Sequence, residues 1–270
     1  MDLQMPVIAL LSDLGTKDYF VGALKGAILS INPNAVIVDI THEVPRHDVL
    51  TAAFTLAHAA ETFPKNTIFV AVVDPGVGTS RKSILLTTEN GLFFIGPDNG
   101  IFTLVAERFG VKEIRELTNK KLMRDEISST FHGRDVFAPV AAHLSRGIAP
   151  AEVGPGLPGM KRLELPRPKI EGGEMVGEVL LIDVFGNILT NIDRELIENF
   201  AGVGDELELD IEGKKLIAKF VRTFAEVGVG ETVCYVGSAN LLEVAKNQGN
   251  LAGDIAARAH LKIRLRRVKG

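Results

Sequence analysis

The sequence predicts two domains: an α/β N-terminal domain with a mostly parallel sheet, and a smaller all-β C-terminal domain resembling an antiparallel barrel. Three observations lead to this prediction. In the first half of the 270 residues, short apolar runs alternate with segments whose apolar residues recur at helical spacing. A stretch rich in proline and glycine follows, and beyond it short strand-like runs dominate. We therefore expect an α/β domain over 1–155, a linker over 156–174 and a β-barrel domain over 175–270.

The N-terminal domain begins with VIALLS (7–12), an apolar run typical of a strand buried on both faces. A helix is expected next, and Pro33 closes it. Around Asn90-Gly91 the sequence predicts a hairpin, because this dipeptide favours a type I′ turn. Strands that alternate with helices imply a mostly parallel sheet covered on both faces. The other elements expected here are helices at 19–31, 49–63, 99–110 and 133–147, strands at 35–40 and 66–74, and the hairpin strands within 83–96.

The segment from Gly154 to Glu174 has four prolines, five glycines and no helical periodicity, which is typical of a linker. Beyond it, the strand-like runs are short and are separated by turn residues such as Glu212-Gly213. This pattern predicts a small antiparallel barrel or sandwich. Strands are expected at 175–183, 187–192, 205–211, 214–221, 231–236, 241–245 and 260–266.

The composition is that of an ordinary soluble globular protein, with 46% hydrophobic and 24% charged residues. The formal net charge of −4 argues against a nucleic-acid partner, which would favour a basic face. The single cysteine, Cys234, excludes an internal disulfide framework and a cysteine-based zinc site. No apolar run reaches the roughly 18 residues of a membrane span, and MDLQMP at the N-terminus lacks the basic start of a signal peptide. We therefore expect a cytoplasmic protein without a membrane partner.

Aspartates stand at the ends of three predicted parallel strands: Asp13, Asp39 and Asp74. Ligands of open α/β sheets bind beyond the carboxyl ends of the strands. A single aspartate there could simply cap a turn or a helix, but three together, with an arginine and two histidines on the same loops, favour a polar site. Asp74 and Arg81 flank the glycine-rich turn of VVDPGVGTSR, where the carboxylate would repel a phosphate. A loop-bracing ion pair is the structural alternative for these two residues.

His132 lies in FHGRD (131–135), just before a predicted helix. The neighbouring arginine and aspartate suggest a site, but the spacing alone leaves a structural role open. A metal site would use His42, His47 and His132 with an aspartate, yet no local His-x-x-x-His pair supports it. A Ser-His-Asp hydrolase also has little support, because no G-x-S-x-G elbow occurs.

Six motifs follow one another along the chain: SDLGTKD, VVDPGVGTSR, GPDNG, FHGRD, IDVFGN and GSANLLEVAKNQGN. Together they resemble the S-adenosylmethionine hydroxide adenosyltransferases, or SAM hydrolases, which are relatives of the fluorinase and chlorinase that make halogenated adenosines. The resemblance covers about residues 7–260. It implies an α/β domain followed by a β-barrel, no metal, and a homotrimer. In that family, each ligand lies between the N-terminal domain of one subunit and the C-terminal domain of its neighbour.

The resemblance implies that Asp74, Arg81 and His132 are the catalytic residues of a member that uses water. The fluorinase instead has a tyrosine at the position of Asp74 and a serine at that of Gly133. Elementary chemistry agrees, because SAM releases a neutral thioether, which is a good leaving group, so that no general acid is required. Water needs a base, and Asp74 could accept its proton while Arg81 and His132 orient it toward the ribose C5′.

The same resemblance implies a set of substrate-binding residues. Asp13 matches an aspartate that accepts hydrogen bonds from both ribose hydroxyls, and Asn247 matches a contact to the adenine edge. Phe131 would stack near the ribose, although Phe131 and Phe185 could equally be core residues. The halogenases have an arginine where this chain has Ala239, so a side-chain contact from that position is in doubt. Residues matched to the methionine and adenine ends are Asp18, Asp183, Phe185, Asn187 and Ser238.

The sequence therefore predicts the hydrolysis of SAM to adenosine and L-methionine by attack of an activated water or hydroxide on C5′. SAM is the substrate, and no cofactor is expected. Two alternatives remain: a non-catalytic module that binds adenosine or SAM, and a SAM-dependent halogenase. A sensor would have no use for the three catalytic residues, and a carboxylate in the nucleophile pocket would repel a halide.

Overall fold

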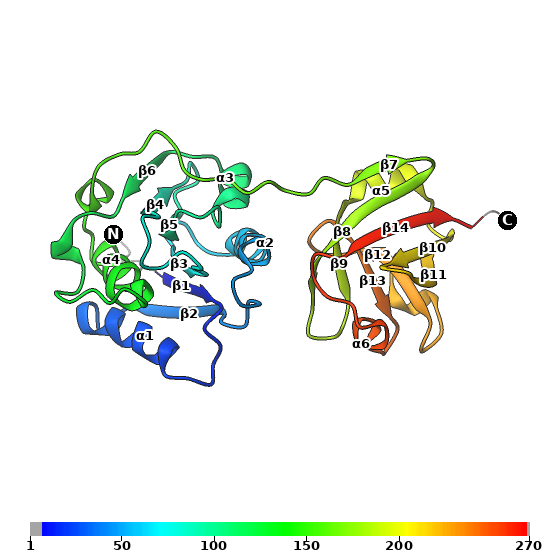
Figure 1. Ribbon diagram of the computed structural model, residues 1–270, viewed down its shortest axis with the longest axis horizontal. Coiled ribbons are helices and arrows are strands. Elements are labelled where there is room, and N and C mark those ends of the chain that lie inside the picture. The colour runs from blue at the N-terminus through cyan, green and yellow to red at the C-terminus, as the bar shows by residue number, and fades with distance from the viewer. Residues whose placement is uncertain (1–6, 269–270) are drawn as a thin grey trace. The chain divides into compact units, whose positions relative to one another are not determined.

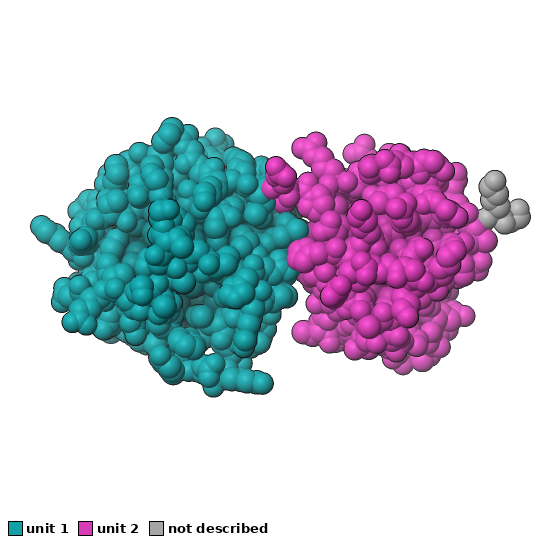
Figure 2. Space-filling model, in the orientation of Figure 1, with its two compact units in different colours: residues 1–163 teal, residues 164–270 magenta. Residues whose placement is uncertain are grey.

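The computed structural model describes residues 7–268, so the six N-terminal residues behind the signal-peptide expectation lie outside the described part. The chain divides into two compact units, residues 1–163 and 164–270 (Figures 1 and 2). This division falls within the segment expected as a linker. Each unit has its own hydrophobic core, and each is described by itself.

The first unit is built on a six-stranded sheet. Its strands are β1 (Val7–Ser12), β2 (Val36–Thr41), β3 (Ile68–Val72), β4 (Ser83–Thr87), β5 (Phe93–Pro97) and β6 (Glu113–Glu116). The order is β2-β1-β3-β5-β4-β6, in which the first four strands are parallel and β4 is antiparallel to both β5 and β6. The predicted mostly parallel sheet is confirmed, and the carboxyl ends of β1, β2 and β3 share one edge.

Helices cover both faces of this sheet (Figure 1). They are α1 (Phe20–Ile31), α2 (Val49–Ala60), α3 (Thr103–Phe109) and α4 (Ala138–Ser145). Successive residues of a strand point to opposite faces, so Ile8 and Leu10 join a core with α1 and α4, while Ala9 and Leu11 join a core with α2 and α3. Because a buried core packs against each face of β1, its residues from Val7 to Leu11 are all apolar instead of alternating with polar ones.

Local details differ from the sequence prediction. The hairpin of β4 and β5 forms, but its turn is not type I′, because Gly91 has a positive φ of 86° and Asn90 does not. Helix α3 begins only at Thr103, because the Asn99 side chain accepts from Ile101 N and the Thr103 hydroxyl donates to Gly100 O, which builds a turn before it. The helix expected from 133 opens with a π-helical turn, Gly133–Phe137. Strand β6 and the 3₁₀ turns Lys120–Leu122 and Pro150–Val153 were not expected.

The second unit is a β-barrel. Its strands are β7 (Lys169–Glu171), β8 (Glu174–Ile182), β9 (Ile188–Asp193), β10 (Glu206–Ile211), β11 (Lys214–Phe220), β12 (Thr232–Val236), β13 (Leu241–Lys246) and β14 (Lys262–Arg267). A pairing of β14 with β8 closes a ring of seven strands, and β7 adds to β8 outside it. All neighbouring pairs are antiparallel except β11 with β12. The predicted antiparallel barrel is confirmed.

Two short helices of the barrel unit were not expected, α5 (Arg194–Phe200) and α6 (Leu251–Ile255). Both begin at a side-chain cap, since Asp193 accepts from Leu196 N and Asn250 accepts from Gly253 N at 2.7 to 2.8 Å. A 3₁₀ turn covers Phe224–Glu226. Across residues 7–268, no helix is long and apolar enough to cross a membrane.

Candidate active site

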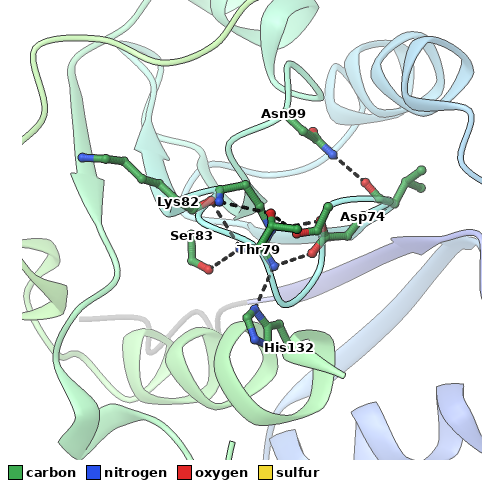
Figure 3. Close-up of polar contacts among 9 residues, drawn as sticks. Asp74, Thr79, Lys82, Ser83, Asn99 and His132 are labelled. Atoms are coloured by element: carbon green, nitrogen blue, oxygen red, sulfur yellow. Dashed lines mark hydrogen bonds and ion pairs between the residues drawn. The ribbon is translucent and has the colours of Figure 1, made fainter. Parts of the chain in front are cut away.

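Asp74 and Arg81 form a buried ion pair at the carboxyl edge of the first unit's sheet (Figure 3). Their side chains are only 6% and 5% exposed. The Arg81 guanidinium donates from Nε to Asp74 Oδ1 at 2.9 Å and from Nη2 to Asp74 Oδ2. This two-bonded geometry fixes the orientation of both groups. It also leaves each carboxylate oxygen able to accept a further hydrogen bond, because an ionised carboxylate offers about four acceptor positions.

Arg81 connects this pair to two more side chains. Its Nη1 donates to Ser83 Oγ at 2.7 Å, and its Nη2 lies 2.8 Å from His132 Nδ1. A guanidinium can only donate hydrogen bonds, so Nδ1 of His132 must accept. The hydrogen of the neutral imidazole therefore sits on Nε2, which makes His132 a donor on its other side.

Burial and the charge of Arg81 both lower the pKa of His132 below its usual value, while Asp74 and Asp135 oppose this only in part. Protonation would place a hydrogen on Nδ1, directly facing the Arg81 donor. The imidazole is therefore neutral at neutral pH. His132 is suited to hold a water molecule by donation rather than to remove its proton.

The local fold around His132 explains its position. His132 directly precedes the π-helical turn Gly133–Phe137, and such turns are frequent at functional sites. An added Cβ at Gly133 would lie 3.1 Å from Val72 and 3.3 Å from Leu24, so only a residue without a side chain fits against β3 and α1 without displacing them. The backbone next to His132 is thus seated directly on the end of β3, the strand that leads to Asp74.

Three residues that were not among the predicted site residues support the same loops. Ser83 accepts from Arg81, and Asn99 Nδ2 donates to Val73 O at 2.8 Å, next to Asp74. Asp135 is fully buried, pairs with Arg134 at 2.6 Å and accepts from Ser128 N at 2.9 Å. The motifs GPDNG and FHGRD contained Asn99 and Asp135, but a motif alone does not indicate which loop a side chain holds.

The predicted substrate-binding residues of this unit lie in different environments. Asp13 follows β1, is 11% exposed and accepts from His47 N at 2.9 Å. Asp18 is exposed in the same loop. Phe131 is buried, with its ring edge-on to Phe20 at 5.3 Å and the Arg134 guanidinium over its face at 5.1 Å. Asp18 is therefore exposed to solvent, whereas the Asp13 carboxylate is largely buried and Phe131 is mostly a packing residue.

Asp39, the third strand-end aspartate, does not join the Asp74 cluster. It lies within β2 rather than beyond its end. Its carboxylate accepts from Lys25 Nζ at 2.6 Å and lies 3.2 Å from His42 Nε2. Burial alone would raise the pKa of Asp39, but the contacts with Lys25 and His42 outweigh this effect and hold the pKa below its usual value.

Four of the five predicted ligand residues of the barrel unit lie in two turns. In the turn between β8 and β9, Asp183 accepts from Phe185 N and Asn187 N at 2.9 Å, and from Asn187 Nδ2 at 2.8 Å. These hydrogen bonds order the turn. Phe185, which lies in this turn, is 72% exposed and presents an apolar side chain to solvent. Ser238 is exposed in the turn between β12 and β13.

Asn247 uses its amide within the barrel unit. Its Nδ2 lies 3.1 to 3.3 Å from the carbonyl oxygens of Phe224, Val227 and Gly228, to which it donates. Sequence reasoning also missed Glu243, which is 8% exposed and accepts from the Tyr235 hydroxyl at 2.6 Å. Burial raises the pKa of Glu243, and the charge of Asp183 adds to this rise although the Tyr235 hydrogen bond opposes it.

No three histidine, cysteine, aspartate or glutamate side chains gather as a metal site would require, in the part of the chain that the structure describes. Two of the histidines considered for such a site turn a ring nitrogen to another side chain. His42 Nδ1 faces Ser12, and His132 Nδ1 faces Arg81.

Comparisons with known proteins agree with the two-unit fold. The SAM hydroxide adenosyltransferase N-terminal domain matches residues 8–154, and the C-terminal domain of the same family matches residues 177–266. A crystal structure of an uncharacterized conserved protein from Thermotoga maritima has a TM-score of 0.91 at 41% identity, covering 96% of this chain and 100% of that one.

Two named relatives extend over almost the whole chain. An (R)-S-adenosyl-L-methionine hydrolase of Thermus thermophilus is 37% identical and covers 97% of this chain and 100% of its own length. A fluorinase of an Actinoplanes species is 33% identical, with 96% of each protein covered. Since both domain models match in order and the relatives align along 96% or more of their lengths, the chain belongs to the SAM hydroxide adenosyltransferase family.

Proposed function

We propose that this protein hydrolyses S-adenosyl-L-methionine to adenosine and L-methionine. The observation that carries the proposal is the buried cluster of Asp74, Arg81 and His132 at the carboxyl edge of a parallel sheet. Such edges are where α/β proteins bind ligands. The curated relatives named as SAM hydrolases support the same reaction.

The contacts of the cluster suggest a role for each residue. Water has a pKa of about 15.7 in bulk and is a weak nucleophile, so a group that accepts its proton accelerates attack. Asp74 can accept at the carboxylate positions that Arg81 leaves free, while His132 donates from Nε2 to the water oxygen. Arg81 holds both groups in place.

The bond changes are those of a displacement at carbon. The water oxygen forms a bond to the ribose C5′, and the bond from C5′ to sulfur breaks with its electron pair going to sulfur. The sulfonium thereby becomes the neutral thioether of methionine, and the water proton passes to Asp74 and then to solvent. No cofactor takes part in this balance.

Substrate recognition is assigned to residues of both units. Asp13 would accept from the ribose hydroxyls, with Phe131 near the sugar, and Asp18 in the same loop would contact the methionine end. The barrel unit would hold the methionine end and the adenine. Its residues in this proposal are Asp183, Phe185, Asn187, Ser238 and Asn247. For Asn247, the contact would use Oδ1, because its Nδ2 is engaged with backbone carbonyls.

The proposal includes a homotrimer, with each site completed by the barrel of a neighbouring subunit, and a cytoplasmic location. Closed rings are a common outcome when one surface of a protomer binds a different surface of the next. Subunits inactivated by His132→Ala and subunits inactivated by Asp183→Ala can be dissociated, mixed and reassembled. Recovery of activity in the mixture supports a shared site, and mixtures as inactive as either parent would refute it.

A halogenase and a non-catalytic binding module are the alternatives. Both are tested by incubating the protein with SAM in water enriched in heavy oxygen, with and without chloride. We expect heavy oxygen in the adenosine 5′-hydroxyl and none in methionine, which requires attack at carbon. Chlorinated nucleoside as the main product in salt would favour a halogenase. The absence of any product would favour a binding module.

A further inference from the structure

A chain of polar contacts lies beside the candidate catalytic cluster and is not part of it. It runs from Lys25 on α1 through Asp39 on β2 and His42 to Ser12, the last residue of β1. The distances are 2.6 Å from Lys25 Nζ to Asp39 Oδ2, 3.2 Å from Asp39 Oδ1 to His42 Nε2, and 2.6 Å from His42 Nδ1 to Ser12 Oγ. We call these four residues the Ser12–Lys25 relay.

The direction of each contact follows from the donors. The Asp39 carboxylate can only accept, so the His42 hydrogen belongs on Nε2 and Nδ1 accepts from the Ser12 hydroxyl, whose oxygen also accepts from Leu14 N at 3.3 Å. This Nε2 faces the Asp39 carboxylate at 3.2 Å as an ion-pair contact without hydrogen-bond geometry. Lys25 balances the charge of Asp39 at the surface end.

A serine, a histidine and an aspartate in contact could suggest a hydrolase triad. Burial argues against that role, because Ser12 is 1% exposed and His42 is 4% exposed. A nucleophile must be able to reach a carbonyl carbon, and the Ser12 hydroxyl points to a buried ring instead. The relay is therefore suited to holding the chain in place.

The segments that the relay joins both contact Asp13. Ser12 directly precedes Asp13, and His42 leads into the turn whose His47 N donates to Asp13 Oδ2 at 2.9 Å. Backbone bonds tie the same two segments together: Gly15 N donates to His42 O at 2.7 Å, and Val44 N to Ser12 O at 3.3 Å. The orientation of the Asp13 carboxylate thus depends on how the segment from 42 to 47 is seated.

We propose that Ser12, His42 and Asp39 are positioning residues that set the orientation of the Asp13 carboxylate, and through it the preference for a ligand with free ribose hydroxyls. This inference rests on the proposed function, since Asp13 is the ribose-binding residue of that proposal. It assigns a role to Asp39 and His42, which the catalytic cluster does not use. A carboxylate must be held within a narrow range of angles to accept from two neighbouring hydroxyls at once.

The test compares the affinities for adenosine and 2′,3′-dideoxyadenosine, measured by calorimetry on the assembled protein. The ratio of the two is the ribose preference, which a general loss of stability would leave unchanged. We expect Ser12→Ala to reduce this ratio by about five- to tenfold, the usual scale for losing one buried hydrogen bond. Asp39→Asn should also reduce the ribose preference. Because the Asp39 side chain is 40% exposed, this variant can be used if Ser12→Ala folds poorly.

Asp13→Asn should lower the ratio most, and Ser12→Ala should add little in that background, because the two changes act through one carboxylate. The matched control is Ser145→Ala on α4, which removes another buried hydroxyl, one that donates to Ala142 O and accepts from Asn32 Nδ2. It should leave the ratio unchanged.

Each outcome decides the inference. If Ser12→Ala and Asp39→Asn weaken both nucleosides equally, or if Ser12→Ala adds in full to Asp13→Asn, the relay does not act on ribose recognition. If Asp13→Asn itself leaves the ratio unchanged, the ribose role of Asp13 is wrong, and the inference is overturned together with that part of the proposed function.

Discussion

Gly78 offers a way to disturb the candidate catalytic geometry without changing any reacting group. Gly78 lies in the glycine-rich turn between Asp74 and Arg81, with a φ of +77°. An added Cβ would lie 2.5 Å from the carbonyl oxygen of Ser129, which belongs to the loop that leads to His132. The Gly78→Ala variant should therefore push apart the two loops that the contact between Arg81 and His132 joins.

The structure gives the size of the disturbance. A carbon and a carbonyl oxygen normally approach no closer than about 3.3 to 3.6 Å, so the loops must separate by roughly 1 Å. The loop of His132 has little freedom to follow, since Gly133 is seated against Val72 and Leu24. A misplacement of about 1 Å in a catalytic arrangement can reduce turnover by about 100-fold. We expect a loss of that order in kcat for Gly78→Ala.

Gly91→Ala is the matched control. Gly91 also has a positive φ, 86°, but an added Cβ there would meet no atom within 4 Å. Both substitutions place alanine in a left-handed conformation, at a cost of about 1 to 2 kcal/mol. Only Gly78→Ala adds the collision with Ser129. Thermal unfolding measures the shared cost, and steady-state kinetics with SAM measures the effect on turnover.

The comparison has a clear refuting outcome. If Gly78→Ala and Gly91→Ala lose the same stability and both keep nearly normal kcat, the distance between the two loops does not control catalysis. The assignment of Arg81 and His132 to one catalytic unit would then be wrong. A large loss of kcat in Gly78→Ala could also disappear once the two variants are compared at equal folded fraction. That result would likewise refute the assignment of Arg81 and His132 to one catalytic unit.

Two further predictions concern the chemistry of the cluster. Asp74→Asn should reduce kcat by roughly 10²- to 10⁴-fold with little change in SAM affinity, and near-normal turnover would show that Asp74 is not the proton acceptor. Because the pKa of His132 lies below its usual 6.5 and only the neutral ring accepts from Arg81, activity should be lost as the pH falls, with the acid limb of kcat/KM below pH 6.5. An acid limb above pH 6.5, measured between pH 5 and 8, would contradict this assignment.

The predictable parts of the fold were those set by local sequence pattern. The strand β1 is apolar from Val7 to Leu11 because cores lie on both of its faces. Alternation of strand and helix then predicts parallel order, and this places Asp13 and Asp74 at one edge. The edge strand β6 was missed because EIRE carries three charged residues and only Ile114 of its four residues is buried.

The contacts within the candidate site could not be predicted in the same way. Residues 81 and 132 are joined by one hydrogen bond between two loops, and no periodicity encodes such a contact. Asp39 and Asp74 occupy similar places in the sequence, each near the end of an apolar run. Asp39 instead contacts Lys25 of α1 and His42, whereas Asp74 pairs with Arg81.

The pairing of Asp74 with Arg81 also bears on why one fold serves water in some family members and a halide in others. An anion requires a site with net positive charge or free donors. Here the charge of Arg81 is balanced by Asp74, His132 is neutral, and the donors of Arg81 are directed at Asp74, Ser83, the Lys82 carbonyl and His132. A halide entering this cluster would meet a carboxylate and no unpaired cation, whereas a water molecule can both donate to Asp74 and accept from His132 Nε2. In the proposed mechanism, the carboxylate that accepts the water proton therefore also disfavours a halide, and we expect a change from water to halide to require the loss of this carboxylate.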